Sequence, residues 1–303
     1  MAYKALHAEA SEELWLPGSS ACQGCGSTLA LRWVLKALGK KTVVVAPASC
    51  ANVYVGWWPR SSAGVPYFDM AFAAGGSAAS GVAAALEYLN RKDITVVTWA
   101  GDGGTSDIGI QALSGAAERG TNFIYICYDN EAYMNTGTQR SSSTPFGAWT
   151  TTTPFGKKQQ KKNVPMIMAA HDIPYVATAT SSYTKDLYEK VKKAKDIEGT
   201  KYIHILAPCP PGWRFETESI VEIGKLAVET GMWVLYEIEN GNFKLSPPSK
   251  RLLDSSKRKP IQEYIRLQGR FKNVKDEEIQ VLQNGIDKQW EKYKKLEEGC
   301  GKF

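Results

Sequence analysis

The sequence predicts an α/β fold with a doubly wound, mostly parallel sheet. Short runs rich in Val, Ile and Tyr alternate along the chain with stretches of helical periodicity. Most of these runs are apolar throughout, as expected for strands that helices cover on both faces. With 303 residues, 43% of them hydrophobic, the chain is also long enough to bury a large core. Ligands in this architecture bind beyond the carboxyl ends of the strands, so those positions are searched first.

The elements follow each other in a βαβα order. The expected strands are 42–48, 94–100, 123–129, 173–180, 202–208 and 233–239. The expected helices are 27–38, 76–89, 108–119, 184–196 and 216–229. Strands joined by helical crossovers pair in parallel, with right-handed connections.

Two segments interrupt this alternation. Residues 136–163 have no clear periodicity, and a loop of that length is either functional or an excursion over the surface. From residue 244 onward the chain is charged and helix-forming, most clearly over 276–299. We therefore expect a binding domain over 1–243 and a C-terminal extension over 244–303, packed on that domain or on a neighbouring chain.

Charge and hydropathy exclude several classes of protein. The net charge of +6 comes from Lys-rich segments at 157–162 and 250–303, which are compatible with an acidic partner and equally with a solvated surface. No run combines dense Arg with aromatic residues, so we expect no nucleic-acid partner. No apolar stretch is long enough to cross a bilayer, and the N-terminus does not resemble a signal peptide. We expect a cytoplasmic protein that does not bind membranes.

A glycine-rich turn follows the strand at 94–100. The run "ITVVTWAGDGGTSDIG" contains Gly101-Asp102-Gly103-Gly104 and then enters a helix near Asp107. Glycines there let backbone N–H groups approach a phosphate, and the next helix favours its negative charge. Asp102 is a hard oxygen ligand for Mg²⁺. The alternative is a tight turn with a helix-capping aspartate.

The next strand supplies a second polar side chain. In "FIYICYDNEAYMNTGTQ", Asn130 follows the strand, 28 residues after Asp102. Adjacent parallel strands end side by side, so the oxygens of both side chains are expected to meet at one Mg²⁺ ion.

The six cysteines form the second candidate site. They are Cys22, Cys25, Cys50, Cys127, Cys209 and Cys300. The Cys22-x-x-Cys25 pair is compatible with a zinc site, a redox pair or an iron–sulfur centre. Cys50 and Cys209 each follow an expected strand, on the same sheet edge as the glycine-rich turn. Alternatively, Cys50 is a buried apolar residue; for Cys127 and Cys300 a structural or apolar role is expected.

The glycine-rich turn and the later asparagine resemble the signature of thiamine diphosphate enzymes. In that family an Asp, an Asn and a backbone carbonyl two residues beyond the Asn hold Mg²⁺ against the diphosphate. The resemblance implies that Asp102, Asn130 and the carbonyl of Ala132 do so here.

Both candidate sites together make the chain resemble the thiamine-diphosphate-binding β subunit of 2-oxoacid:ferredoxin oxidoreductases, the pyruvate synthase type in particular, including its oxalate oxidoreductase relatives. The resemblance runs from about residue 17 to 213. It is carried by "CQGCGSTLALR", "SCAN", "GDGGTSDIG", "YDNEAYMNTGTQRSS" and "CPPGWR". The chain lacks the "GLTKGQ.SPT" pattern of the 2-oxoglutarate type.

The resemblance implies a role for particular residues. One [4Fe–4S] cluster would be ligated by Cys22, Cys25, Cys50 and Cys209, with the turn at 49–52 between cluster and cofactor. Asn135 matches an active-site asparagine and is expected to be catalytic. The expected cofactor-binding residues are Ser49, Cys50, Gly101, Asp102, Gly103, Gly104, Asn130, Asn135 and Thr136.

The same resemblance implies the reaction and the partners. We expect oxidative decarboxylation of a small 2-oxoacid, with electrons passing through the cluster to ferredoxin. Pyruvate, with coenzyme A, is the leading substrate; oxalate without coenzyme A, 2-oxoisovalerate and aryl 2-oxoacids stay open. An α subunit is expected to supply the glutamate that activates the cofactor, with γ and a ferredoxin-like δ subunit completing the enzyme. A non-redox thiamine enzyme and a zinc-binding module are the other classes considered.

Overall fold

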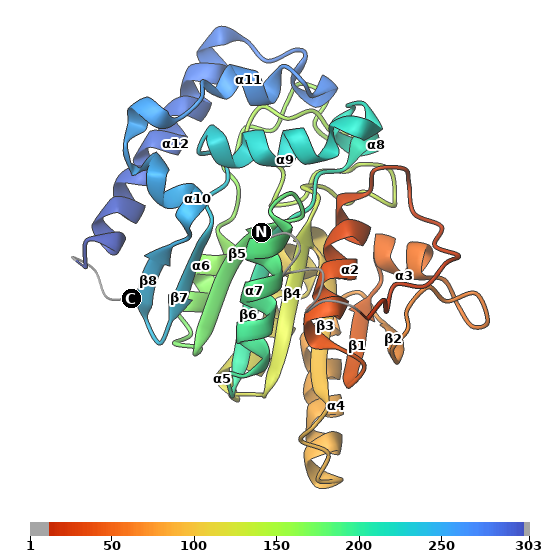
Figure 1. The fold of residues 1–303 in the computed structure, drawn as a ribbon. Helices are drawn as coiled ribbons and strands as arrows, with labels where there is room; N and C mark the ends of the chain where they lie inside the picture. The colour runs from red at the N-terminus through yellow and green to blue at the C-terminus, as the bar shows by residue number, and fades with distance from the viewer. Residues whose placement is uncertain (1–11, 300–303) are drawn as a thin grey trace.

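The computed structural model describes residues 12–299, and their strands form one eight-stranded sheet (Figure 1). The strands are β1 (Thr42–Pro47), β2 (Tyr67–Met70), β3 (Thr95–Gly101), β4 (Phe123–Asp129), β5 (Tyr175–Thr180), β6 (Thr200–Leu206), β7 (Tyr236–Glu239) and β8 (Asn242–Leu245). Their order is β2-β1-β3-β4-β6-β5-β7-β8. The neighbouring strands from β2 to β5 in this order pair in parallel, whereas β7 pairs antiparallel with both β5 and β8. The predicted mostly parallel α/β fold is confirmed.

The helices connect and cover these strands. They are α2 (Gly26–Leu38), α3 (Cys50–Val55), α4 (Gly75–Tyr88), a π-helical turn (Gly103–Ile108), α5 (Ile110–Glu118), α6 (Val164–Ala169), α7 (Thr184–Lys195), α8 (Pro210–Trp213), α9 (Ile220–Glu229), α10 (Pro247–Lys250), α11 (Ile261–Ile265) and α12 (Asp276–Glu297). Short 3₁₀ turns lie at Thr217–Ser219, Arg251–Leu253, Ser255–Lys257 and Gly269–Phe271.

The central strand β4 shows why the sheet is apolar on both faces. All of its residues are buried, and successive side chains point to opposite sides. Ile126 and Tyr128 belong to the hydrophobic cluster that includes α2 and α7, which lie in front of the sheet in Figure 1. Tyr125 and Cys127 belong to the cluster on the other face, with α5. A strand covered in this way needs apolar residues at every position, which is the pattern the sequence showed.

Several short elements were not predicted. The strands β2 and β8 are four residues long, lie at the two edges of the sheet and are only partly buried, so their sequences lack a continuous apolar run. Of residues 49–52, expected to form a turn, Ser49 is the N-cap and the other three form the start of α3. The helix expected from residue 108 is preceded by a π-helical turn that starts at Gly103.

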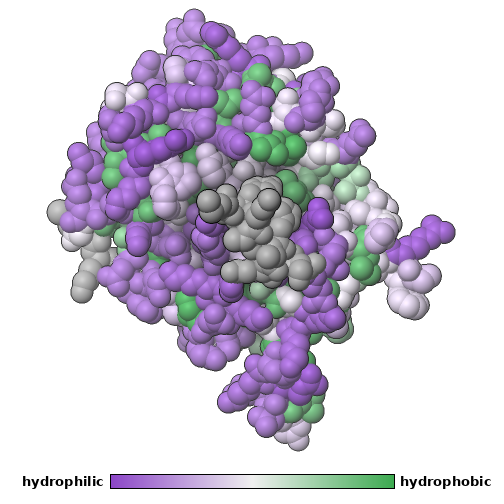
Figure 2. Space-filling model, in the orientation of Figure 1, coloured by the Kyte–Doolittle hydropathy of each residue, from purple (hydrophilic) through white to green (hydrophobic). Residues whose placement is uncertain are grey.

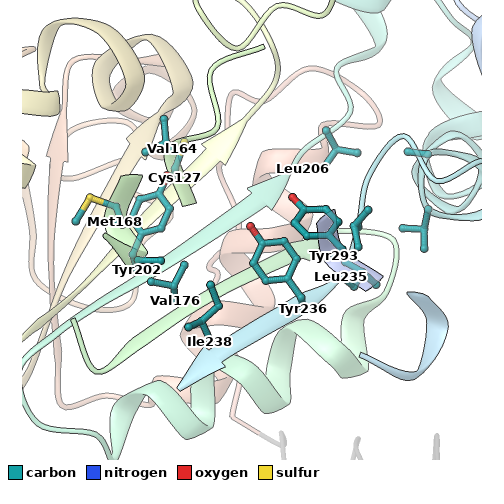
Figure 3. Packing of buried hydrophobic residues seen from close by; sticks show 14 of the residues in the cluster. Cys127, Val164, Met168, Val176, Tyr202, Leu206, Leu235, Tyr236, Ile238 and Tyr293 are labelled. Carbon is teal, nitrogen blue, oxygen red and sulfur yellow. The ribbon is translucent and has the colours of Figure 1, made fainter. Parts of the chain in front are cut away.

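The C-terminal extension packs on the sheet, which is the first of the two expected alternatives. Tyr293 of α12 contacts Tyr236 of β7, with ring centroids 5.3 Å apart, and stacks on Phe243 of β8 at 5.4 Å. Figure 3 shows Tyr236 and Tyr293 side by side within the buried cluster. The expected boundary between 243 and 244 falls inside β8, and whether the part beyond it forms a separate domain stays a prediction.

The surface over these elements is largely polar. Figure 2 shows hydrophilic residues over most of the face seen in Figure 1, with scattered hydrophobic patches between them. Among residues 12–299, none of the helices combines the length and the apolar composition that crossing a bilayer requires.

Candidate active site

The two predicted polar side chains meet at the ends of neighbouring strands. β3 and β4 are adjacent and parallel, with Gly101 opposite Tyr128. Asp102 directly follows β3 and Asn130 directly follows β4, as predicted. A cavity of about 260 Å³ opens at this edge of the sheet. It is lined by every predicted cofactor-binding residue: Ser49, Cys50, Gly101, Asp102, Gly103, Gly104, Asn130, Asn135 and Thr136.

Three oxygen atoms converge at the base of this cavity. The amide oxygen of Asn130 lies 3.0 Å from Oδ1 of Asp102 and 2.9 Å from the carbonyl oxygen of Ala132. Turning the amide over would let its NH₂ group donate to both of these oxygens. With the amide oxygen on this side, the three groups form a set of oxygens that a cation would bring together. Their spacing matches neighbouring corners of an octahedron with Mg–O distances of about 2.0–2.1 Å. The donor set therefore fits Mg²⁺.

The backbone around Asn130 directs these oxygens. The indole N–H of Trp213 donates to the carbonyl of Asn130 at 2.8 Å. The hydroxyl of Thr144 donates to the carbonyl of Glu131 at 2.7 Å. Both carbonyls are held away from the cavity, while the next one along the chain, that of Ala132, faces the side chains of Asp102 and Asn130.

Asp102 is oriented from its other side by the long loop. The hydroxyl of Ser141 donates to Oδ2 of Asp102, which leaves Oδ1 for the cavity, and the backbone N–H of Ser143 donates to Ser141 at 3.2 Å. Burial and the nearby Asp129 carboxylate raise the pKa of Asp102 well above its usual range. A divalent cation would stabilise the ionised form of such a carboxyl. The loop at 136–163 therefore contacts a proposed Mg²⁺ ligand, and its functional role stays a prediction.

The absence of side chains in the glycine-rich turn lets an aromatic ring pack against its backbone. A Cβ atom on Gly103 would lie 2.4 Å from the ring of Tyr133. That ring is fixed by its hydroxyl, which donates to Asp107 at 2.8 Å. A Cβ atom on Gly109 would lie 2.0 Å from the carbonyl of Gly104, so Gly109 permits the wide π-helical turn. Such turns occur frequently at functional sites.

Asn135 and Thr136 lie at the mouth of the cavity. Both are exposed, so their side chains are accessible to a substrate or to another chain. Cys50, the first residue of α3, lines the same cavity, and the backbone N–H of Asn135 acts to lower the pKa of its thiol. The predicted catalytic asparagine and the predicted cluster ligand are therefore direct neighbours.

The four predicted cluster cysteines come from three segments of the chain that lie close together. The backbone N–H of Gly26, next to Cys25, donates to the carbonyl of Pro208, next to Cys209, at 3.2 Å. Burial raises the pKa of Cys50 to about 12, and the thiols of Cys25 and Cys22 add to this effect. Burial likewise raises the pKa of Cys209, with smaller contributions from the same thiols.

A closed ligand set is nevertheless not formed in the structure. Within residues 12–299, no three side chains among His, Cys, Asp and Glu are arranged to hold a metal ion. The cluster therefore stays a prediction. Cys127 is fully buried in β4, in agreement with its expected apolar role, and Cys300 lies outside the described residues.

Sequence reasoning missed several residues of this site. Ser141 and Lys161 lie in the loop without periodicity, and Arg270 lies in the C-terminal extension, far from any motif. Glu131 and Ser141 both stand inside the quoted "YDNEAYMNTGTQRSS" run, and the position of Glu131 between two proposed ligands is the signal that could have drawn attention to it. A larger cavity of about 760 Å³ between α12 and the sheet contains none of the predicted site residues.

Comparisons with known proteins match these features. Residues 57–205 match the family described as thiamine pyrophosphate enzyme, C-terminal TPP binding domain. The chain is 51% identical over 300 residues to the ketoisovalerate oxidoreductase subunit VorB of Pyrococcus abyssi, covering 96% of this chain and 95% of the relative. It is 50% identical over 281 residues to the pyruvate synthase subunit PorB of Methanothermobacter marburgensis, covering 91% and 96%.

One solved structure also shares the fold. The 2-oxoglutarate:ferredoxin oxidoreductase of Magnetococcus marinus, solved with 2-oxoglutarate, coenzyme A and succinyl-CoA bound, matches with a TM-score of 0.58. The match covers 72% of this chain and 80% of that one, at 21% identity. At that identity the likeness concerns the fold.

Proposed function

This chain belongs to the family of thiamine-pyrophosphate-binding β subunits of 2-oxoacid:ferredoxin oxidoreductases, and from that premise we propose how its residues divide the work. Residues 1–243 hold thiamine diphosphate, Mg²⁺ and one [4Fe–4S] cluster. Together with its partner subunits, the chain oxidatively decarboxylates a small 2-oxoacid and passes the electrons to ferredoxin. The observation that carries the proposal is the convergence of three oxygens, from Asp102, Asn130 and Ala132, at the ends of β3 and β4.

Mg²⁺ would be held by these three oxygens and would neutralise the diphosphate that fills the glycine-rich turn. When bound, thiamine diphosphate supplies an electron sink for the carbanion that decarboxylation of a 2-oxoacid produces. The residues of this chain bind and orient: Ser141 fixes Asp102, and Trp213 fixes the carbonyl of Asn130. Asn135 would contact the substrate, and its exposure at the mouth of the cavity supports this role.

The cluster would be ligated by Cys22, Cys25, Cys50 and Cys209. The proximity of the three segments that carry them supports this assignment. Ligation by iron would convert the thiols to thiolates despite their raised pKa values. Because Cys50 also lines the cofactor cavity, a cluster held by these cysteines would supply one-electron chemistry next to that cavity.

The site is incomplete within one chain. The family's activating glutamate belongs to an α-type partner, which we propose covers the open mouth, with γ and δ subunits completing the complex in the cytoplasm. Apolar side chains are exposed on α3, on the loop that follows it and on β2: Val53 (52% exposed), Trp57 (77%), Trp58 (90%) and Phe68 (51%). Exposed aromatic side chains of this kind mark surfaces that bind proteins.

The substrate is proposed to be pyruvate, with coenzyme A. Pyruvate and coenzyme A would yield acetyl-CoA, carbon dioxide and a proton, and two ferredoxin molecules would each take one electron. A second candidate is 2-oxoisovalerate, because the VorB relative matches the chain as well as the PorB relative does, at 51% against 50% identity. The two substrates differ only in the size of the group next to the 2-oxo carbon.

A substrate panel tests this proposal. The complex containing this chain, purified without oxygen, would be assayed for ferredoxin reduction with pyruvate, 2-oxoisovalerate, aryl 2-oxoacids and oxalate, each with and without coenzyme A. The highest kcat/KM is expected for pyruvate, with full dependence on coenzyme A. A higher value for 2-oxoisovalerate selects the second candidate. Activity on oxalate alone, or decarboxylation without ferredoxin reduction, contradicts the proposal.

A further inference from the structure

A buried glutamate, Glu131, lies in the chain between two residues that supply proposed Mg²⁺ ligands. Glu131 lies between Asn130 and Ala132, is only 3% exposed, and has a φ angle of +65°. Residues other than glycine seldom adopt this left-handed conformation, and they keep it where surrounding contacts impose it. This conformation allows the side chain of Asn130 and the carbonyl of Ala132 to face the same point.

Two cations hold the carboxylate of Glu131, one on each oxygen. Nζ of Lys161 lies 2.8 Å from Oε1, and a terminal nitrogen of Arg270 lies 2.6 Å from Oε2. Lys161 comes from the end of the long loop, and Arg270, which is 139 residues after Glu131, comes from the C-terminal extension. The three segments therefore meet at a single carboxylate.

Arg270 is itself positioned by groups that belong to the site. Its guanidinium lies 3.8 Å from the ring centre of Trp213, the residue whose indole holds the carbonyl of Asn130. Its Nε donates to the side chain of Gln268 at 2.9 Å. Arg270 is 3% exposed, so its contact with Glu131 is shielded from water and stronger than a surface ion pair.

Lys161 couples the same carboxylate to the end of β4. Its Nζ also lies 2.6 Å from Oδ2 of Asp129, and it lies over the ring of Trp233 at 4.9 Å. Asp129 in turn accepts a hydrogen bond from the backbone N–H of Glu131 at 2.9 Å. The side chain and the backbone N–H of Glu131 are therefore both held in place, and the residues that flank Asn130 in the chain are joined to each other.

We propose that Glu131 is a positioning residue, and that Lys161 and Arg270 hold it in the conformation that aims Asn130 and Ala132 at Mg²⁺. This inference rests on the proposed thiamine diphosphate and Mg²⁺ site. It assigns a function to the loop at 136–163 and to the C-terminal extension, since each supplies one of the two cations. Losing one cation leaves a buried carboxylate half-paired, which disturbs the ligands next to it.

The test measures how thiamine diphosphate binding depends on the Mg²⁺ concentration. Binding to the assembled complex would be followed by calorimetry for the wild type, Arg270→Gln, Arg270→Lys and Glu131→Gln. Arg270→Gln and Glu131→Gln are expected to raise the Mg²⁺ concentration for half-saturation by about 10-fold or more, as for other residues that orient metal ligands. Arg270→Lys retains the charge and should restore part of the loss.

Two controls separate positioning from general stability. Arg266→Gln changes an exposed arginine four residues earlier and should leave the Mg²⁺ dependence unchanged. Visible absorbance and the thermal unfolding midpoint would be recorded for each variant. If Arg270→Gln and Glu131→Gln both keep the wild-type Mg²⁺ dependence, the inference is overturned, even where they lower the unfolding midpoint. A wild-type complex that binds no thiamine diphosphate at any Mg²⁺ concentration overturns the proposed function and this inference with it.

Discussion

Oδ1 of Asp102 lies 3.0 Å from the amide oxygen of Asn130, although the two residues are 28 positions apart and follow different strands. In this orientation of the amide, the carbonyl of Ala132 completes a set of three oxygens that fits a cation, whereas the opposite orientation would let the NH₂ group donate to both neighbours. The parallel pairing of β3 and β4 creates this contact, and Ser141 and Trp213 aim the two groups. The chemistry of the site follows from that arrangement.

Removing the carboxylate should abolish cofactor binding. Asp102→Ala deletes one of the three oxygens, so the purified complex is expected to retain no thiamine diphosphate while its visible absorbance persists. Cofactor content after gel filtration measures this. Asp196→Ala, at an exposed helix end, is the matched control and should retain the cofactor. Full cofactor content and activity in Asp102→Ala would show that the Mg²⁺ assignment is wrong.

Loosening the same carboxylate should have a graded effect. Ser141→Ala removes the hydroxyl that donates to Oδ2 of Asp102. A hydrogen bond to a charged group contributes about 1.5–3 kcal/mol, so we expect roughly a 10-fold to 100-fold rise in the Mg²⁺ concentration for half-saturation. A titration of thiamine diphosphate binding with Mg²⁺ measures this, and an unchanged midpoint would remove Ser141 from the site.

The distant cysteine should be required for the cluster. Cys209→Ser is expected to lower the iron and sulfide content of the anaerobically purified complex, because the hydroxyl is a poor substitute for a thiolate ligand. Cys127→Ser, in the buried strand β4, is the matched comparison and should leave the iron content unchanged. The opposite pattern would transfer the fourth ligand from Cys209 to Cys127.

The C-terminal helix should contribute strongly to stability. Trp290 of α12 is 2% exposed, donates to the carbonyl of Gly231 at 3.0 Å and lies under the guanidinium of Arg258. Trp290→Ala is expected to lower the free energy of unfolding by about 3–5 kcal/mol, as measured by chemical denaturation. Tyr88→Ala, at a side chain that is 90% exposed on α4, should change it by less than about 0.5 kcal/mol. Equal effects would mean that α12 is not part of the core.

Continuous apolar runs were sufficient to predict the strands that are buried on both faces. The limits of β4 were predicted to the residue, because every position in it is apolar or aromatic up to Asp129. An edge strand pairs with only one neighbour and is partly exposed to solvent, so the sequences of β2 and β8 lack the continuous apolar run that predicts a strand. The same holds for α3, whose six residues are too few for a periodic pattern.

The site was predictable only where its residues follow strands. Asp102 and Asn130 could be found because strand ends in a parallel sheet share one edge. Ser141 stands in a quoted motif, but its contact with Asp102, like the contacts of Lys161 and Arg270 with Glu131, is a tertiary contact that the sequence does not reveal. The π-helical turn depends on the close approach of Gly109 to the carbonyl of Gly104, which is likewise visible only in three dimensions.

The central claim is that one chain holds both thiamine diphosphate with Mg²⁺ and an iron–sulfur cluster. Metal, sulfide and cofactor analysis of the anaerobically purified complex tests it most directly, with the α-type partner present and any clusters of other subunits counted separately. We predict one thiamine diphosphate, one Mg²⁺ and about four iron atoms with equal sulfide assigned to this chain, together with broad visible absorbance. Zinc alone in this chain, with no visible absorbance and no thiamine diphosphate, would contradict the account.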